Sequence, residues 1–303
     1  MNKDGRQLLA WVDEGRGQGH GAKYQPWLRI SRRGQVANGN LSKPYIPVLG
    51  RDGDLMSANE ANLAPWLLWL GASDLREQFP LWPHPHVHPI HGHPLADHCR
   101  LPWSSGTSVI ARDLGIKHGT FRGTKIPYVA TTDLMLTIIE CGKPRLIAVA
   151  VKPASVVSGE IKLPRRNRER LVLEAAYAKE LGIPWYLMSN AMVSPDLREN
   201  IDVAFGAQKL PDNIPQSVIT DFCESAAELI SGGEAIQVAI DQVTECLRLD
   251  ADVAKGIFHH GLWTRRIPID LREKLVMSRS AKLTDFSWAK REAVAIFGEH
   301  DHA

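Results

Sequence analysis

The 303-residue chain is long enough for two ordinary domains, because one hydrophobic core usually stops growing at about 250 to 300 residues. Hydrophobic residues make up 44% of the chain and charged residues 23%, which excludes a disordered or collagen-like protein. No apolar run approaches the roughly 18 residues of a membrane span, and the first residues lack the apolar segment of a signal peptide. We therefore expect a cytoplasmic protein with no membrane partner. The four cysteines include no Cys-x-x-Cys pair, which argues against a zinc ribbon or a disulfide framework.

Charge is distributed unevenly along the chain. Residues 1–195 carry 24 basic and 16 acidic side chains, whereas residues 196–303 carry 12 and 18, so the two parts have net charges of +8 and -6. Within residues 196–262 the imbalance is 4 basic against 12 acidic. This asymmetry favours a polyanion such as DNA as the partner of the first part and protein as the partner of the second.

The first quarter of the chain predicts loops, short strands and one helix. The glycine-rich segment Gly15 to Gly21 runs into Gln-Pro rather than into a helix, so a flexible surface loop is favoured over a phosphate-binding loop. The apolar stretch Trp27 to Ile30 reads as a strand, and Ser31 to Asn40 as a polar loop. Ser57 to Leu70 has helical spacing, and its Ser-x-x-Glu start is a capping box.

Residues 82–103 contain six of the twelve histidines, interleaved with prolines. Proline at that density predicts a surface loop without regular structure. Zinc binding remains a minor alternative, because the spacing matches no closed zinc site. The candidate ligands would be His84, His86, His88, His91, His93, His98 and Cys99.

The segment from Thr131 to Pro153 predicts a β-hairpin. Two β-rich apolar runs are separated by Glu-Cys-Gly-Lys-Pro-Arg, which is suitable turn chemistry. A turn centred between Gly142 and Lys143 would place Asp133 directly opposite Lys152, with Cβ atoms about 4.5 to 5.5 Å apart. An aspartate and a lysine on neighbouring strands are typical of PD-(D/E)xK nucleases, in which the carboxylate holds a divalent cation that activates water. The alternative is a surface salt bridge of little energetic value.

A helix is predicted at Arg168 to Leu181 and a strand at Trp185 to Met188, so the strand, helix, strand order implies an α/β layer. Beyond Pro195 the pattern is helical. Three helices followed by β-like residues are the order of a winged-helix module, although a plain helical bundle fits the periodicity equally well. The predicted C-terminal elements are helices at 214–230, 234–249 and 252–260, a β-like piece at 263–269 and a helix at 278–295.

Two further glutamates have alternative interpretations. Glu60 completes the capping box, and capping is the better explanation on pattern alone. Glu174 has Arg170 one turn before it, so it either forms a solvated helical ion pair or faces the edge of the sheet where Lys152 emerges. Basic residues at the start of the same helix oppose its dipole, a cost that a phosphate would offset, and an extended, solvated basic loop is the equally weighted alternative. The DNA-contacting candidates are Lys117, Arg122, Lys125, Arg165, Arg166 and Arg168.

Eight collinear blocks of the sequence resemble the TnsA family, the endonuclease subunits of heteromeric cut-and-paste transposases. They cover the N-terminal two thirds of the chain, and the C-terminal third is less distinctive. The blocks are EGRGQGHGAKYQPWL (14–28), SANE (57–60), SDLREQFPL (73–81), IARDLGIKHG (110–119), TTDLML (131–136), AVKPA (150–154), LEAAY (173–177) and IPWYL (183–187).

The resemblance implies a restriction-endonuclease-like, PD-(D/E)xK catalytic domain over residues 1–194 and a mostly helical, winged-helix-like domain over residues 195–303. It implies hydrolysis of the strand at the 5′ ends of a transposon with Mg²⁺, for which Mn²⁺ would substitute. The implied partners are transposon-end DNA, a TnsB-like transposase and a TnsC-like ATPase regulator that binds the C-terminal domain. The implied catalytic residues are Glu60, Asp133, Lys152 and Glu174, and the implied metal ligands are Glu60, Asp133 and the carbonyl of Val151.

One position departs from the nuclease pattern. Two residues before the lysine such enzymes usually have Glu, Asp or Gln, and this chain has Ala150. Weaker metal binding or slower cleavage would follow. Two rival functions therefore stay open: a stand-alone restriction or repair nuclease, and a non-catalytic adaptor that joins DNA to a regulator.

Overall fold

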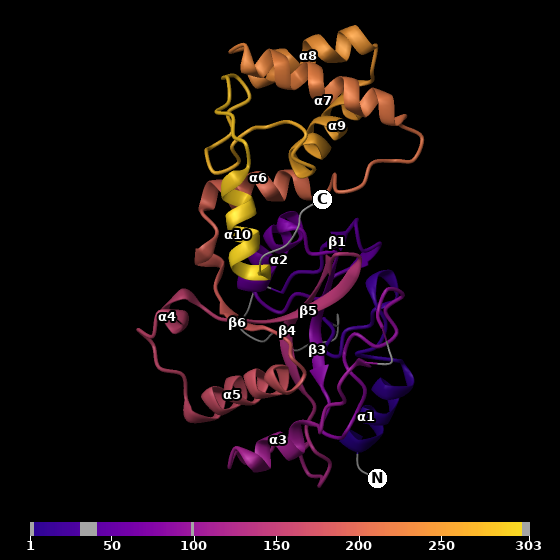
Figure 1. The fold of residues 1–303 in the computed structure, drawn as a ribbon, viewed down its shortest axis with the longest axis vertical. Coiled ribbons are helices and arrows are strands. Elements are labelled where there is room, and N and C mark those ends of the chain that lie inside the picture. Colours follow the sequence, from indigo (N-terminus) through magenta and orange to yellow (C-terminus); the bar gives the residue numbers. More distant parts are fainter. Residues whose placement is uncertain (1–2, 31–40, 98–99, 299–303) are drawn as a thin grey trace.

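A computed structural model describes residues 3–30, 41–97 and 100–298 of the protein. It has the mixed α/β architecture that the sequence predicts (Figure 1). The elements of the first part are α1 (Lys3–Asp13), η1 (Gly21–Lys23), β1 (Tyr45–Ile46), β2 (Arg51–Asp52), α2 (Ala58–Leu70), β3 (Asp74–Leu81), α3 (Thr107–Asp113), β4 (Ala130–Glu140), β5 (Lys143–Val151), α4 (Ala154–Val157), α5 (Arg165–Glu180), β6 (Trp185–Met188) and η3 (Asn190–Met192). The second part has α6 (Pro195–Phe205), α7 (Gln216–Ser231), α8 (Ile236–Leu247), α9 (Ala251–Trp263) and α10 (Ser287–Phe297). None of the helices in the described residues is both long and apolar enough to cross a bilayer.

The central sheet has four strands in the order β3-β4-β5-β6. The first three are antiparallel, and β6 lies parallel to β5 after the chain crosses over through α5. The predicted hairpin, the predicted strand at 185–188 and the α/β layer are thus confirmed. The helix α5 begins at Arg165, three residues before the predicted start.

The predicted turn of the hairpin is centred one residue too late, so the observed partner of each residue differs from the predicted one by two residues. Leu134 pairs with Val149 and Glu140 with Lys143, so the turn consists of Cys141 and Gly142. Both turn residues have positive φ values, 47° and 74°, as in the two-residue turns whose twist matches that of the flanking strands. Continuing this register by one step places Ala150, not Lys152, opposite Asp133, and Lys152 lies two residues further along on the same side of the strand.

The two faces of the sheet are covered by different helices (Figure 1). One face packs against α2 through Leu134, Leu136, Ile147 and Val149, and this core continues into the C-terminal helices. The other face packs against α5 through Met135, Ala148 and the α5 residues Leu173 and Tyr177. Because side chains alternate along a strand, the single hairpin supplies apolar residues to both cores.

Several expectations for the N-terminal region are wrong. Trp27 to Ile30 is not a strand, although Trp27 is fully buried. The glycine-rich loop is not purely a surface feature, because Gly17 is buried and a Cβ there would lie 2.2 Å from Cγ of Pro80. Close packing on β3 and a φ of 78° therefore require glycine at this position. The predicted polar loop at 31–40 lies outside the described residues.

The predicted C-terminal strand is also wrong. The helix α9 continues to Trp263, and Ile269 makes an isolated bridge with Leu283 instead of belonging to a strand. The last helix begins at Ser287, nine residues after its predicted start. The C-terminal part is mostly helical, as expected, and its winged-helix identity stays a prediction.

The helix α2 connects the sheet to the C-terminal part through Trp69. Its indole N–H donates to the carbonyl oxygen of Leu262 at 3.4 Å, and its ring stacks on Trp288 with centroids 5.6 Å apart. The Arg265 guanidinium lies 4.3 Å from the ring centroid of Trp69. The apolar core is continuous across residues 194 and 195, where the predicted domain boundary remains a prediction.

We expect Trp69→Ala to lower the free energy of unfolding by about 3 to 5 kcal/mol, because a large buried aromatic is removed and leaves a cavity. Trp69 is 3% exposed, whereas Trp103 is 68% exposed and provides a matched control. Trp103→Ala should change the unfolding free energy by less than about 0.5 kcal/mol. Urea denaturation of both variants measures the difference. Equal effects of the two substitutions would contradict the connecting role of Trp69.

Candidate active site

Asp133 and Lys152 meet at the end of the β4–β5 pair despite the register shift. The Asp133 Oδ2 atom accepts hydrogen bonds from the Lys152 ammonium and from the Val151 amide, each at 2.7 Å. The same ammonium donates to the Val151 carbonyl oxygen at 2.9 Å. A diagonal pair on one face of a sheet lies within reach of a long side chain, so lysine bridges a distance that a shorter residue could not. A cationic group thus lies between the two oxygens predicted to bind metal.

Glu60 takes part in the capping of α2 and also lies near Asp133, so the two interpretations of this residue are compatible. Ser57 Oγ accepts from the Glu60 amide at 3.2 Å and lies 2.8 Å from Oε1, so the serine caps α2 as predicted. The Oε2 atom accepts from the Met56 amide at 2.9 Å and from the Gln78 side-chain amide at 3.2 Å. Glu60 is only 4% exposed. Burial, followed by the negative charge of Asp133, raises its pKa to about 7.

Gln78 is a site residue that the sequence analysis did not select. It lies in β3 with a φ of 49°, and the ladder is regular on either side of it, where Glu77 pairs with Leu134 and Phe79 with Thr132. In the ladder between β3 and β4, Gln78 therefore lies opposite Asp133. Its Oε1 atom accepts from the Thr131 hydroxyl at 3.4 Å, while its amide holds Glu60. A left-handed backbone at a non-glycine residue costs about 1 to 3 kcal/mol, and no local pattern in a strand signals it.

Glu174 faces the site and also forms the predicted ion pair. Its Oε1 atom lies 3.3 Å from Nε of Arg170, while its Oε2 atom is buried without a hydrogen-bond partner among the described residues. Burial, followed by the charge of Asp133, raises the pKa of Glu174 to about 8 although Arg170 opposes the shift. Arg170 also donates to the Thr131 carbonyl oxygen at 3.0 Å. The pair is therefore solvated only on the arginine side.

The chemistry of these groups suits a divalent cation, although no set of three His, Cys, Asp or Glu side chains in the described part of the chain is close enough together to form a metal centre. Asp133 and the Val151 carbonyl already hold a cationic amine, and oxygen ligands of this kind are those that Mg²⁺ prefers. Burial, followed by the negative charge of Asp133, raises the pKa values of both Glu60 and Glu174. Ala150 contributes no side-chain oxygen. The ligand set of Glu60, Asp133 and Val151 remains a prediction.

The histidine-rich segment is irregular, as predicted, but it is not wholly a surface loop. His88 and Ile90 are 7% and 2% exposed. Both ring nitrogens of His86 are engaged, with the His84 carbonyl and the Tyr177 hydroxyl, and both of His88, with the Leu181 carbonyl and the Ile90 amide. The rings of His86 and His88 therefore have no nitrogen left for zinc, and no three possible ligands come together in the described part of this segment.

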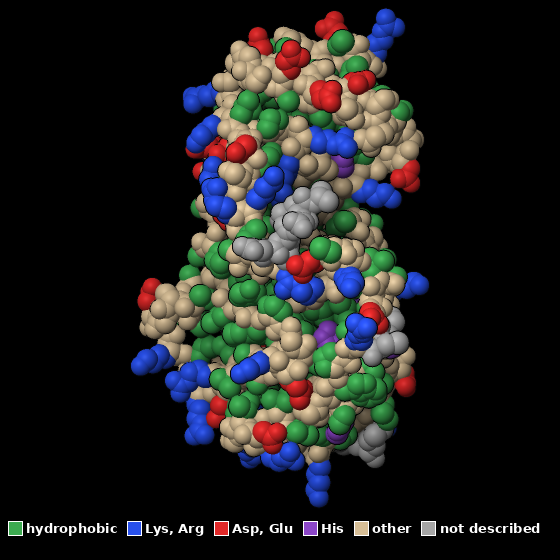
Figure 2. Space-filling model, viewed as in Figure 1, with side chains coloured by type: hydrophobic (Ala, Val, Ile, Leu, Met, Phe, Trp, Pro, Cys, Tyr) green, Lys and Arg blue, Asp and Glu red, His purple; other side chains and the backbone are tan. Residues whose placement is uncertain are grey.

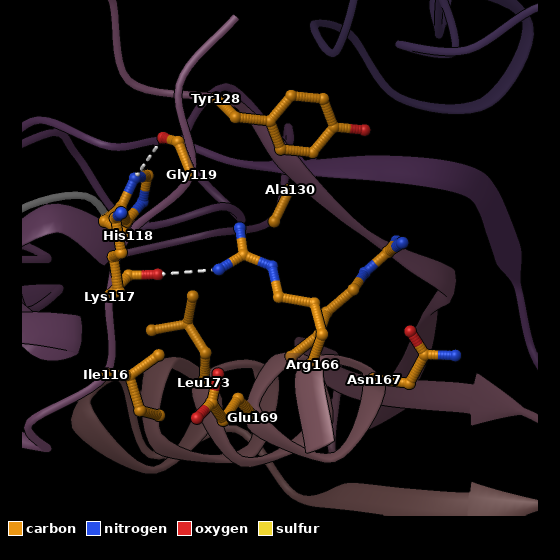
Figure 3. A pocket seen from close by; sticks show the side chains of 11 residues that line it. Ile116, Lys117, His118, Gly119, Tyr128, Ala130, Arg166, Asn167, Glu169 and Leu173 are labelled. Carbon is orange, nitrogen blue, oxygen red and sulfur yellow. Dashed lines mark hydrogen bonds between the residues drawn. The ribbon is translucent and has the colours of Figure 1, made fainter. Parts of the chain in front are cut away.

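A basic pocket of about 270 Å³ lies beside the acidic residues, between the 116–130 segment and α5. Figure 3 shows Arg166 extending from α5 across the pocket, where its guanidinium donates to the Lys117 carbonyl oxygen at 2.9 Å. Leu173 and Ala130 form apolar parts of the lining, and Arg170 belongs both to this pocket and to the Glu174 ion pair. Lys117 and Arg166, both predicted to contact DNA, are thus brought together.

The remaining DNA-contacting candidates are exposed but do not share this pocket. Arg122 and Lys125 lie on the loop between Thr120 and Pro127, which form an isolated bridge. Arg165 pairs with Glu169 one turn later at 2.7 Å, and Arg168 is exposed. Lys and Arg side chains gather over α5 and α3 in Figure 2, at the lower left and bottom of the view.

The raised pKa of Glu174 predicts how stability depends on pH. A carboxyl whose folded pKa is about 8 binds more protons in the folded than in the unfolded state above pH 4.5, so stability falls as pH rises from about 4.5 to 8. Glu174→Gln should remove this contribution, and the variant should be more stable than wild type at pH 8 without divalent ions, by roughly 1 kcal/mol or more. Denaturant titrations at pH 5 and pH 8 test this. A variant that is less stable than wild type at both pH values would refute it.

Comparison with known proteins gives two partial matches, both to TnsA-like proteins. Residues 84–190, which include Asp133, Lys152 and Glu174, match the family model described as TnsA-like endonuclease N terminal. The chain is 33% identical over 199 residues to the transposon Tn7 transposition protein TnsA of Escherichia coli. That match covers 65% of this chain and 61% of the relative, so the chain spans about three fifths of that protein's length. Residues 84–190 thus match the N-terminal domain of TnsA-like endonucleases, and the chain is similar to TnsA over 65% of its length.

Proposed function

We propose that this protein is a Mg²⁺-dependent DNA endonuclease that hydrolyses the strand at the 5′ ends of a transposon, within a heteromeric transposase. The observation that supports this best is the Lys152 ammonium held between Asp133 Oδ2 and the Val151 carbonyl, at 2.7 and 2.9 Å. An amine and oxygen ligands in direct contact, beside two acids with raised pKa values, match the needs of metal-assisted phosphodiester hydrolysis.

Each side chain would have a distinct role. Asp133, Glu60 and the Val151 carbonyl would hold the cation, which, once bound, supplies Lewis acidity and lowers the pKa of the attacking water. Lys152 would move from the Asp133 oxygen to the scissile phosphate, where an ammonium stabilises the charge that develops in the transition state. Glu174 would serve as an accessory acid, and its deprotonation would be favoured by the cation. Gln78 would fix the orientation of the Glu60 carboxylate.

The DNA backbone would approach along the basic side of the molecule. Arg166 and Lys117 lie at the pocket next to the carboxylates, and the candidates Arg122, Lys125, Arg165 and Arg168 extend this surface. Contacts to phosphates bind without reading sequence, so selection of the transposon ends would come from a TnsB-like transposase. The acidic helical C-terminal part, which we propose to be winged-helix-like, would contact a TnsC-like ATPase.

Asp133→Asn and Lys152→Ala should each reduce nicking of transposon-end DNA by at least about 100-fold in Mg²⁺ or Mn²⁺, because each removes a group that acts in the transition state. Gel assays of purified protein with the partner transposase measure this. Arg112→Ala is a suitable control, since Arg112 is exposed and pairs only with its neighbour Asp113 among the described residues.

Near-normal cleavage by either site variant would refute the assignment. Cleavage of any plasmid by the wild-type chain alone, with its own site preference, would favour the stand-alone nuclease. Salt-sensitive DNA binding without nicking in any divalent ion would favour the adaptor.

Arg166→Glu should weaken DNA binding about equally for all sequences and should reduce the steepness of its salt dependence by about one unit of the log-log slope or more, because phosphate contacts release counterions. Filter binding over a range of salt concentrations measures both quantities. Lys209→Glu is the control, because Lys209 lies in the C-terminal part and pairs with Asp212 at 3.5 Å. A sequence-dependent loss would contradict a phosphate-contacting role.

A further inference from the structure

A second cavity of about 340 Å³ lies at the β3 edge of the sheet, separate from the carboxylates of the proposed active site. Four segments enclose it: residues 17–20 of the glycine-rich loop, β3 with the residue that follows it, the histidine segment at 86–91 and Tyr177 of α5. The proposed endonuclease function uses none of these lining residues.

Arg76 is the one Arg or Lys among the described residues that line this cavity. It is 2% exposed, and its NH1 atom donates to the Pro89 carbonyl oxygen at 2.9 Å. Its guanidinium lies 4.6 Å from the ring centroid of Phe79. A second aromatic ring, that of Tyr24, has its centroid 6.0 Å away, so one hydrogen bond and two aromatic contacts hold the side chain at the cavity wall.

The other two nitrogens of the guanidinium, Nε and NH2, are buried and have no hydrogen-bond partner among the described residues. No carboxylate of the described chain lies within 4 Å of Arg76 in an ion pair. The nearby Asp74 favours the charged form at longer range, but its Oδ2 atom accepts from the Gly21 amide at 2.9 Å. A buried charge without a direct counterion is costly, and burial lowers the pKa of Arg76 accordingly.

A neighbouring arginine, Arg51, has the carboxylate partner that Arg76 lacks among the described residues. Arg51 is also largely buried, but it makes two hydrogen bonds to the Glu77 carboxylate, at 2.8 and 2.9 Å. This fork-to-carboxylate geometry is the arrangement that a guanidinium favours. Arg76 has the same kind of two-donor edge, Nε and NH2, but both atoms are buried without a partner in the described chain, in a residue that lines the cavity.

The histidines His20, His86 and His88 at the cavity do not supply a counterion for Arg76. Burial lowers the pKa of His86 and of His88, and it lowers that of His20 to about 4, so all three rings are neutral near pH 7. His20 Nε2 contacts the His91 carbonyl oxygen at 3.2 Å and therefore carries the proton. The cavity thus combines the Arg76 guanidinium with three neutral imidazole rings, those of His20, His86 and His88.

We propose that this cavity binds a small oxyanion of the phosphate class through the two free donors of Arg76. A tetrahedral oxyanion presents paired oxygens to a guanidinium as a carboxylate does, and it would remove the unpaired buried charge. Because the cavity touches four separate segments, the anion would also fasten the glycine-rich loop and the histidine segment to β3 and α5. The proposal does not depend on the nuclease assignment.

Inorganic phosphate should raise the melting temperature of the full chain by about 2 °C at ten times its Kd, relative to chloride at equal ionic strength and pH. Arg76→Met should abolish this rise while keeping the volume of the side chain. Asp133→Asn should retain it, which separates this site from the proposed active site. Isothermal titration with phosphate and with a deoxynucleoside monophosphate shows whether the ligand is a free ion or a phosphate ester.

Two substitutions of opposite charge at one residue of the cavity lining test the proposal without altering Arg76. Gln18 lines the cavity and is exposed, so Gln18→Glu should weaken phosphate binding by roughly fivefold and Gln18→Lys should strengthen it. Absence of any phosphate-specific rise in wild type, or an equal rise in Arg76→Met, would overturn the proposal. Equal affinities of the two Gln18 variants would overturn it as well, since the ion would then bind elsewhere.

Discussion

The arrangement of the candidate active site depends on one electrostatic constraint, the gathering of three carboxylates at the end of one hairpin. Asp133 is paired with Lys152, but Glu60 and Glu174 are buried near it, and their pKa values rise to about 7 and 8. Each carboxylate comes from a different element, Glu60 from α2, Asp133 from β4 and Glu174 from α5. Folding of the sheet and of both covering helices is therefore needed before these charges come near one another.

The same helix that brings Glu60 to this site also holds the two parts of the chain together. Glu60 lies in the first turn of α2, and Trp69 lies in its last, against Leu262 and Trp288. Because a helix is stiff and this one is buried over most of its length, a displacement at one end would be transmitted to the other. A shift of the C-terminal helices would thus also shift the Glu60 carboxylate.

Buried charge is used in two ways on β3. Glu77 points to Arg51 and is fully satisfied, whereas Arg76, the adjacent residue, points to the opposite side and keeps two donors unpaired. Alternation along the strand explains why consecutive residues meet such different surroundings. Gln78 follows with a left-handed backbone and turns its amide toward Glu60. Three consecutive polar residues in a buried strand thus serve a structural ion pair, a cavity and the acidic site.

The sequence by itself determined the hairpin, the α5 and β6 elements and the helix at 58–70 with its serine cap. These follow from local hydrophobic periodicity, turn chemistry and capping, which act over a few residues. The grouping of Asp133, Lys152 and Glu174 as catalytic candidates came from the resemblance to the TnsA family. Only the tertiary structure decided the pairing register of the hairpin, the burial of Glu60 and Glu174, the role of Gln78 and the unpaired donors of Arg76. Each of these depends on segments far apart in the chain, because desolvation and hydrogen-bond satisfaction are set by the neighbours that folding provides.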